Sequence, residues 1–342
     1  MELNKLHNND NDIFVGFAES RQGGRPENQD SYAFKQTELG FLLTVCDGMG
    51  GGPGGKTAST IAVSEIIAGV EEASKDEEVA NIIIKAIRRA NMTIIETANQ
   101  NPKLKGMGST ATVLLLSEHS VFLAHVGDSR IYQMRGGKKI FRTFDHSMVF
   151  DLVKQKVITE EQARLSAQSN VITRALGIKP DLEVDITERA YEKGDRFVLC
   201  SDGIHGSMRE KEFLKMLSRT KMSLGAMVDD IATYVDNIGR SNGNHHDNLT
   251  IAIIETKINS KLRQTMSKQV RYTLMILAIV CTVSIICNIW QSVGSTKPAP
   301  VQVDSTVIKA QQDTIQQKTA EIKQLQAALD AIKKQTKQNN TK

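Results

Sequence analysis

The chain has 342 residues, with 43 Lys or Arg against 39 Asp or Glu, so its formal charge at pH 7 is only +4. This length allows one large domain with a sizeable core, and so weak a charge gives no reason to expect nucleic acid as a partner. The four cysteines show neither zinc-site spacing nor a small disulfide framework, and the polar first twelve residues lack the apolar stretch of a secretory signal. We therefore expect a domain that is not exported, preceded by a disordered N-terminus over residues 1–11.

Residues 12–257 are predicted to form one domain of short strands and helices. Apolar and β-branched runs indicate strands at 13–18, 41–46, 110–116, 121–126, 131–134, 196–200 and 249–255, and helical periodicity indicates helices near 56–73, 77–99, 146–155, 210–218 and 223–237. The short connection between 110–116 and 121–126 leaves no room for a crossover helix, so this pair must be antiparallel. Hairpins mixed with helices favour an α+β sandwich over a doubly wound parallel sheet.

An uncharged apolar segment, residues 272–290, follows this domain. Its length of roughly nineteen residues is what a helix needs to cross a hydrocarbon core, so we expect one transmembrane helix here. The linker over residues 258–271 is richer in Lys and Arg than the linker over residues 291–304. Because basic flanks tend to stay in the cytoplasm, we expect a single-pass cell-membrane protein with a cytoplasmic domain and an extracytoplasmic tail.

The tail shows helical periodicity over residues 305–336, before a short end at 337–342. Apolar residues recur every seven positions, at Ile308, Ile315, Ile322 and Leu329, although the second position of the heptad is apolar only in the last two repeats. This pattern predicts an imperfect coiled coil that would make the protein a homo-oligomer. A lone amphipathic helix is the alternative.

Aspartates stand at the ends of several predicted strands. Three strands lead into Asp47-Gly48, Gly127-Asp128 and Asp202-Gly203, and Asp247 comes just before the last strand. One Asp-Gly pair is usually a turn, but four carboxylates at the strand ends of one sheet system would repel one another unless they protonate or bind cations. Such oxygen ligands favour Mn²⁺ or Mg²⁺ over zinc.

An arginine precedes these carboxylates. Arg25 lies in a polar loop, five residues before another aspartate, Asp30. A guanidinium group is suited to bidentate binding of phosphate, and its place ahead of the carboxylates favours a functional role over a solvated one.

Seven segments, taken together, resemble the motifs of a known family. They are Arg25-x-x-Asn28-Gln29-Asp30, Val45–Gly51, Gly108–Thr110, Val126–Arg130, Val171–Gly177, Cys200–Gly203 and Asp247–Thr250. In this order they resemble the metal-dependent protein phosphatases, the PPM or type 2C serine/threonine phosphatases, in their bacterial form. Seven motifs in one order are far more specific than any single one.

The resemblance implies an α-β-β-α sandwich of two antiparallel sheets with a two-metal centre at one end. It implies that Asp47 bridges two Mn²⁺ or Mg²⁺ ions, that the Gly48 carbonyl binds one ion, and that Asp202 and Asp247 bind the other. It also implies that Asp128, with Asp202, holds a third and looser ion.

The same resemblance implies that Arg25 binds the substrate phosphate and that Asp30 holds metal-bound waters. The catalytic set would then be Arg25, Asp30, Asp47, Asp202 and Asp247, hydrolysing phosphoserine or phosphothreonine with a metal-activated water. The expected partners are phosphoproteins near the membrane, including Ser/Thr kinases and their substrates.

Two positions depart from the family pattern. Met49 stands where animal members carry a histidine proposed to protonate the leaving oxygen, which a thioether cannot do, so metal-bound water is expected to do it. Residues 143–175 resemble the family's mobile flap, where Ser166-Ala167 replace the His-Pro pair of many bacterial relatives. His146, at the start of this flap, is interpreted as flap structure and not as the acid.

Two other functions are alternatives. Residues Gly50–Thr57 fit the P-loop pattern G-x-x-x-x-G-K-T of nucleotide-binding proteins, although Asp47 and Pro53 do not suit a phosphate cradle. A catalytically inactive membrane phosphoprotein sensor is the other alternative. Against it, Arg25 and all five aspartates are present.

Overall fold

The computed structural model describes residues 3–6, 13–50, 52–74, 76–169 and 171–262, together with Met275 and Ser284. The first half contains β1 (Asn4–Lys5), β2 (Phe14–Arg21), β3 (Ser31–Thr37), β4 (Gly40–Cys46), β5 (Gly48–Met49), α1 (Gly52–Glu71), α2 (Val79–Gln100), the 3-10 helix η1 (Pro102–Leu104), β6 (Gly108–Ser109), β7 (Ala111–Leu116) and β8 (Val121–Val126). The second half contains β9 (Arg130–Arg135), β10 (Lys138–Arg142), α3 (Met148–Lys154), α4 (Glu160–Arg164), β11 (Asp185–Arg189), β12 (Arg196–Cys200), α5 (Asp202–His205), α6 (Glu210–Leu217), α7 (Leu224–Ser241) and β13 (Leu249–Thr256).

The strands form two large sheets and a small ribbon. One sheet has the order β1-β2-β13-β12-β9-β10, the other has the order β11-β8-β7-β4-β3, and β5 pairs with β6. Every strand pair among the described residues is antiparallel, including β7 with β8, as the short connection between them predicted.

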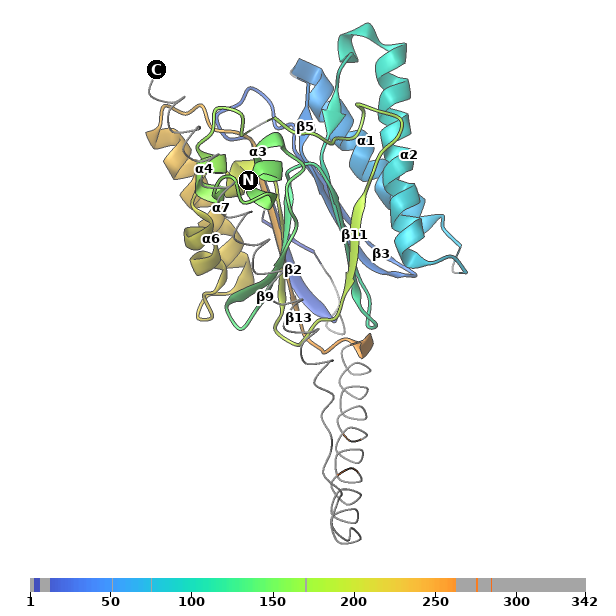
Figure 1. Ribbon diagram of the computed structural model, residues 1–342, viewed down its shortest axis with the longest axis vertical. Coiled ribbons are helices and arrows are strands. Elements are labelled where there is room, and N and C mark those ends of the chain that lie inside the picture. The colour runs from blue at the N-terminus through green and yellow to red at the C-terminus, as the bar shows by residue number, and fades with distance from the viewer. Residues whose placement is uncertain are drawn as a thin grey trace, which may run out of the picture. The chain divides into compact units, whose positions relative to one another are not determined.

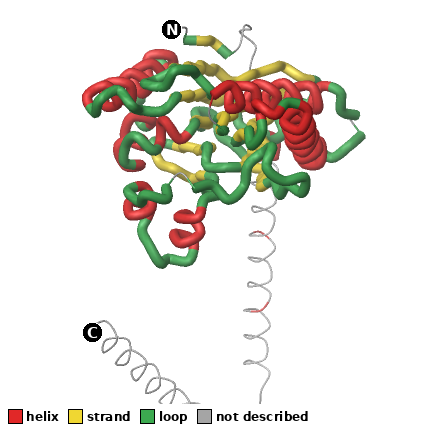
Figure 2. The backbone as a smooth tube through the Cα atoms, turned by 90° about the horizontal axis from the view of Figure 1, so that it is seen from above, coloured by secondary structure: helices red, strands yellow, loops and turns green. Residues whose placement is uncertain are grey.

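The central strands are apolar on both faces because each sheet is covered twice. In β4, Phe41 and Leu43 face a core shared by the two sheets, while Leu42 faces a second core with helices α1 and α2. In β13, Ile254 belongs to the shared core and Ile253 to a third core with α7. Burying each such side chain contributes about 1.5–3 kcal/mol. The result is the predicted α-β-β-α sandwich (Figures 1 and 2).

Helices cover the outer faces of the two sheets. Figure 1 shows α1 and α2 beside one sheet and α6 and α7 beside the other. Figure 2, seen from above, shows the strands between the two groups of helices. Because these helices cover the faces of the sheets, the loops at the ends of the strands remain available to carry functional side chains.

The edges of the domain differ from the expected boundaries. Residues 3–6 were expected to be disordered, but β1 pairs with β2, and Leu6 is buried in the shared core. An apolar side chain and strand pairing thus hold this short segment in place. At the other end the domain continues past residue 257, because the backbone N–H groups of Lys261 and Leu262 donate to the carbonyls of Glu118 and His119.

The predicted segments beyond the domain are not tested by the structure. Apart from Met275 and Ser284, residues 272–290 lie outside the described residues, as does the whole of 305–336. Among the helices that are described, none combines the length and the apolar character needed to span a bilayer.

Candidate active site

Strand register brings the first two predicted aspartates together. Ser31, the first residue of β3, lies opposite Cys46, the last residue of β4. Asp30 precedes that pair and Asp47 follows it, so both stand at the same end of one sheet.

The other sheet supplies three more aspartates at the same end. Cys200, the last residue of β12, lies opposite Arg130 at the start of β9 and opposite Ile251 near the start of β13. Because the strands are antiparallel, the loops that carry Asp128, Asp202 and Asp247 meet where β12 ends. Both sheets therefore contribute carboxylates to one site.

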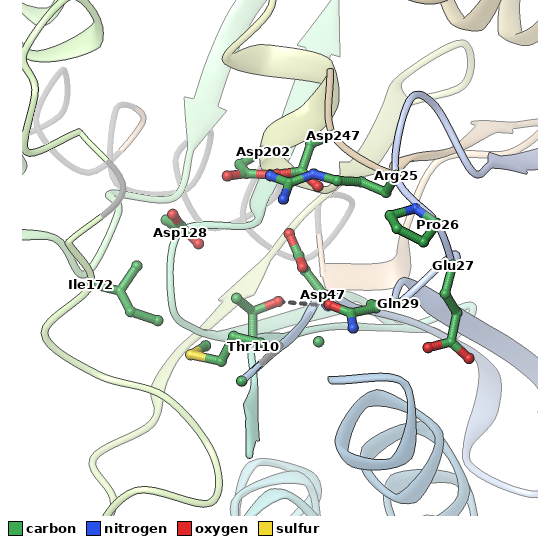
Figure 3. A pocket seen from close by; sticks show the side chains of 13 residues that line it. Arg25, Pro26, Glu27, Gln29, Asp47, Thr110, Asp128, Ile172, Asp202 and Asp247 are labelled. Carbon is green, nitrogen blue, oxygen red and sulfur yellow. Dashed lines mark hydrogen bonds and ion pairs between the residues drawn. The ribbon is translucent and has the colours of Figure 1, made fainter. Parts of the chain in front are cut away.

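These side chains surround a cavity of about 650 Å³ (Figure 3). Its wall consists of Arg25, Pro26, Glu27, Gln29, Asp47, Gly48, Met49, Gly50, Thr110, Asp128, Ile172, Asp202 and Asp247. Six of the seven predicted site residues are in this wall. The exception is Asp30, which is buried behind the wall, where the Ser201 hydroxyl donates a 2.8 Å hydrogen bond to its Oδ2.

The crowded carboxylates raise one another's pKa values. Burial raises the pKa of Asp30 to about 7, and the charges of Asp202 and Asp247 act in the same direction. Burial and the Asp247 carboxylate raise the pKa of Asp202 to about 6. Burial and neighbouring carboxylates also raise the pKa values of Asp47 and Asp128 well above the usual range. These raised pKa values show that the cluster carries more negative charge than the protein around it offsets.

The residues present fit divalent cations. Oδ1 of Asp30 and Oδ1 of Asp202 are buried without a hydrogen-bond donor, and an unpaired buried charged oxygen is costly. Hard oxygen ligands and an excess of negative charge are what Mn²⁺ and Mg²⁺ require. Among the described residues, none of those that form the wall is a cysteine or histidine, which would favour zinc.

Gly48 has no room for a side chain. A Cβ at this position would lie 2.0 Å from the Gly55 carbonyl oxygen and 2.8 Å from the Gln29 carbonyl oxygen. Glycine thus allows the chain after β4 to pack closely against the backbone of Gly55 and Gln29, and Gly48 itself lines the cavity.

Arg25 lies at the mouth of the cavity, and about half of its side chain is exposed. Its Nη2 donates a 2.8 Å hydrogen bond to Asp247 Oδ2, and Figure 3 shows the guanidinium group reaching across toward Asp202 and Asp247. In this position it partly offsets the charge of the carboxylates and remains accessible from solvent.

Thr110 connects two of the aspartate loops and was not assigned a role from the sequence. Its Oγ1 accepts a 2.9 Å hydrogen bond from the backbone N–H of Asp47 and lies 2.8 Å from Ser129 Oγ. His205 Nε2 donates to the carbonyl oxygen of Asp128 at 3.0 Å. The segment Gly108–Thr110 was among the matching motifs, but nothing in the sequence indicated His205.

The P-loop alternative is wrong. Lys56 Nζ donates to the carbonyl oxygen of Asp30 at 2.8 Å and to Ser31 Oγ at 3.1 Å, so it fixes the start of β3 and does not point into a phosphate cradle. The sheet that β4 enters is antiparallel and therefore lacks the parallel strands of that fold.

Comparison with known proteins agrees with this site. Residues 19–232 match the family described as protein phosphatase 2C. Serine/threonine phosphatase stp of Listeria innocua is 31% identical over 243 residues, which cover 70% of this chain and 94% of the relative. Serine/threonine protein phosphatase PstP of Mycobacterium tuberculosis is 35% identical over 197 residues, which cover 56% of this chain and 36% of PstP.

Solved structures give the same result. The structure of serine/threonine phosphatase Stp1 from Staphylococcus aureus matches with a TM-score of 0.66 and 27% identity, covering 73% of this chain and 98% of Stp1. The catalytic domain of PstP in complex with two manganese ions matches with a TM-score of 0.59 and 28% identity, covering 72% of this chain and 99% of that domain.

The chain belongs to the protein phosphatase 2C family. It is a serine/threonine protein phosphatase, and thus a metal-dependent phosphoprotein hydrolase.

Proposed function

We propose that this phosphatase binds two Mn²⁺ or Mg²⁺ ions through Asp47, the Gly48 carbonyl, Asp202 and Asp247. The observation that carries the proposal is the convergence of buried carboxylates from both sheets on one cavity, with raised pKa values and carboxylate oxygens that lack donors. When bound, the ions would activate water as the nucleophile and offset the charge that develops on the phosphoryl group.

The remaining residues position the substrate and hold the carboxylates. Arg25 would exchange Asp247 for the substrate phosphate, because a cation held by that carboxylate weakens its attraction for the guanidinium group. Asp30, whose Oδ2 is fixed by Ser201, keeps Oδ1 available for water at the metal site. Met49 lines the cavity but has no proton to donate, so the leaving oxygen must take its proton from water in the cavity.

Phosphate release from a phosphothreonine peptide by the purified full chain tests this assignment. Release should require Mn²⁺ or Mg²⁺, and EDTA should abolish it reversibly. Arg25→Ala should raise KM, whereas the control Glu27→Gln alters an exposed rim carboxylate and should leave the requirement for metal unchanged. Release that is equally fast in EDTA would contradict the metal assignment.

A third, looser ion at Asp128 and Asp202 is proposed on the same grounds. Asp128 is 8% exposed, lines the cavity and has a pKa that burial and Asp202 raise. Electron paramagnetic resonance titration with Mn²⁺ should count three ions in the wild type and two in Asp128→Asn. Equal numbers in the two proteins would exclude this third site.

We also propose that residues 272–290 span the cell membrane, with the phosphatase domain in the cytoplasm and the tail outside. The uncharged segment and its basic N-terminal flank support this topology. A single cysteine at Ser305, in a protein without native cysteines, should react with an impermeant thiol reagent on intact cells, and one at Lys5 should not. The reverse pattern would overturn the topology.

The proposed substrates are membrane-associated phosphoproteins, including Ser/Thr kinases and their substrates.

We further propose that the heptads over residues 305–336 form a coiled coil that joins copies of the chain. Cross-linking of the full chain in membranes should give an oligomer that Ile315→Asp with Ile322→Asp abolishes. A monomer in the wild type would exclude the coiled coil.

A further inference from the structure

The segment that carries Arg25 connects the end of β2 to the start of β3 and contributes to one wall of the cavity. We call residues 22–29 the arginine loop, and Figure 3 shows Arg25, Pro26 and Glu27 of this loop along that wall. The loop contains neither helix nor strand. Its backbone N–H and C=O groups therefore need partners other than those that a sheet or a helix provides.

One buried side chain supplies three of these partners. The Asn248 amide nitrogen donates to the Gln22 carbonyl at 2.6 Å and to the Glu27 carbonyl at 2.9 Å, and Asn248 Oδ1 accepts from the Gln29 N–H at 2.9 Å. Asn248 is only 4% exposed. Because a carbonyl can only accept and a backbone N–H can only donate, these contacts define the orientation of the amide. The amide thus joins the two ends of the arginine loop, with Arg25 between them.

The chemistry of the amide explains why asparagine suits this position. A primary amide has two N–H donors and one acceptor oxygen, whereas a carboxylate only accepts and a hydroxyl donates a single hydrogen. The backbone of Asn248 has a separate task, since its N–H donates to Asp247 Oδ1 at 2.8 Å. A substitution of the Asn248 side chain therefore removes the contacts with the loop and keeps the backbone contact with Asp247.

The arginine loop also packs directly against the chain beside Asp247. The Gly24 N–H donates to the His246 carbonyl at 3.0 Å. Gly23 has a φ of 64°, and a Cβ there would lie 2.1 Å from the Asp247 carbonyl oxygen. The Arg25 side chain, by contrast, is about half exposed, so its own packing constrains it little. The backbone of the loop must therefore determine where the guanidinium group lies.

We propose that Asn248 is a positioning residue for the substrate phosphate and acts through Arg25. By joining both ends of the arginine loop, it holds the guanidinium group beside Asp247 and the metal-binding side of the cavity. The entropy cost of ordering the loop is then met during folding and not when the substrate binds. The inference rests on the proposed role of Arg25 in binding phosphate.

The chain contains a matched control for this arrangement. Asn91, in α2, is fully buried, and its amide nitrogen donates to the Lys179 carbonyl at 2.8 Å and to the Pro180 carbonyl at 3.3 Å, while its Oδ1 accepts from the Gly177 N–H at 2.7 Å. None of these described residues is in the cavity wall. Asn91→Ala therefore removes the same kinds of hydrogen bond as Asn248→Ala without touching the arginine loop.

Steady-state hydrolysis of a phosphothreonine peptide by the full chain, at saturating Mn²⁺ and at a temperature where the variants are folded, tests the proposal. Asn248→Ala should raise KM and the inhibition constant of inorganic phosphate roughly tenfold, with kcat within about threefold of wild type, because ground-state and transition-state binding are weakened alike. In the Arg25→Ala background, the same substitution should change KM by less than about twofold, since the two residues act as one unit.

Two further measurements separate positioning from general loosening of the fold. Mn²⁺ affinity, followed by paramagnetic resonance, should stay within about twofold of wild type in Asn248→Ala, because Asp247 keeps its backbone donor. Asn91→Ala should lower the melting temperature about as much as Asn248→Ala and leave KM unchanged.

Asn248→Asp is a second variant that tests the same role if Asn248→Ala does not fold. It keeps the size of the side chain and the acceptor for the Gln29 N–H, but lacks the two donors. KM should again rise, and only when Arg25 is present. A rise of equal size with and without Arg25, in either variant, would show that residue 248 acts by another route and would overturn the proposal.

The remaining outcomes distinguish the positioning role from the proposed function. Unchanged KM in both Asn248 variants, with KM raised in Arg25→Ala, would reject Asn248 and leave the phosphate-binding role of Arg25 intact. Unchanged KM in Arg25→Ala would reject both. A rise of KM in Asn91→Ala equal to that in Asn248→Ala would mean that lost stability, and not the position of Arg25, causes the effect.

Discussion

Two aspartates at the opposite ends of strand β12 occupy contrasting environments. Asp195, just before the strand, is fully buried and accepts hydrogen bonds from Arg135 Nε at 2.8 Å, Arg135 Nη2 at 2.6 Å, Gln133 Nε2 at 2.9 Å and the Glu192 N–H at 3.0 Å. Asp202, just after the strand, has one oxygen without a donor, and its nearest charged neighbours include other carboxylates.

This difference separates a structural carboxylate from one that awaits a ligand. Asp195 finds its counter-charge and its donors within the protein, so its charge contributes to the fold. Asp202 is held among like charges that Arg25 offsets only in part, so a cation from solution would stabilise its charged form. Substitutions at the two ends of β12 should therefore have opposite effects on activity and stability.

The largest effect should come from removing charge at the carboxylate cluster. Asp47→Asn and Asp202→Asn should each lower Mn²⁺-dependent turnover by about a thousandfold or more, since metal-based charge stabilisation is lost. Neither should lower the melting temperature in EDTA, because a repulsive charge has been removed. Phosphate release and thermal melts measure the two effects, and near-normal turnover at saturating Mn²⁺ would contradict the comparison.

Asp195→Asn should lower stability and leave turnover nearly unchanged. The amide nitrogen would face donors from Gln133 and Glu192, and Arg135 would keep only Glu192 as a charged partner, so the free energy of unfolding should fall by about 2–4 kcal/mol. Turnover at a temperature where the protein is folded should stay within about threefold of wild type. Urea unfolding measures the change, with Glu118→Gln, in an exposed pair with Lys261, as a control that should alter nothing measurable.

The metal-free protein should also lose stability as pH rises. Folding raises the pKa of Asp30 to about 7 and that of Asp202 to about 6, from an ordinary value of 3.8. Between about pH 4 and pH 7 the folded state therefore binds more protons than the unfolded state, so stability falls as pH increases. Melts in EDTA across this range should show the decrease, and Mn²⁺ should reverse it. A melting temperature that rises from pH 5 to pH 7 in EDTA would be the opposite result.

Lys56→Ala should have the smallest effect. Its ammonium group donates to the Asp30 carbonyl and to Ser31 Oγ, so its removal should cost about 1 kcal/mol of stability and change turnover by less than about threefold. Loss of all turnover would mean that Lys56 acts directly in the reaction. Lys35→Ala, which removes an exposed ion pair with Glu71, is the matched lysine control.

Much of the fold was predictable because its central strands are strongly apolar. Apolar runs in the sequence predicted strands β4, β7, β8, β12 and β13, and helical periodicity predicted α1, α2 and α7. Edge strands β10 and β11 were missed. Their sequences, KKIFR and DITER, are rich in charge, as suits edge strands that must not pair with another molecule, and they carry no apolar alternation.

The candidate site likewise has a part that the sequence predicts and a part that it does not. Its aspartates were predictable because each follows or precedes a recognisable strand beside glycine or asparagine. The residues that hold their loops were not, because the contacts of His205 with Asp128, and of Thr110 with Asp47, span 77 and 63 positions. No local sequence pattern indicates such a long-range contact. Only the register of antiparallel strands brings these residues together.

The place of β13 in its sheet has a consequence for synthesis of the chain. Among the described strands it is the last to be translated, yet it lies in the interior of the sheet between β2 and β12 and pairs with β2 along its whole length. Until it emerges from the ribosome, β2 lacks its partner on one side, and Asp247 cannot be held near Asp47. A chain that stalls before residue 247 lacks one carboxylate of the cluster, and we expect phosphatase activity only after β13 has paired with β2 and β12.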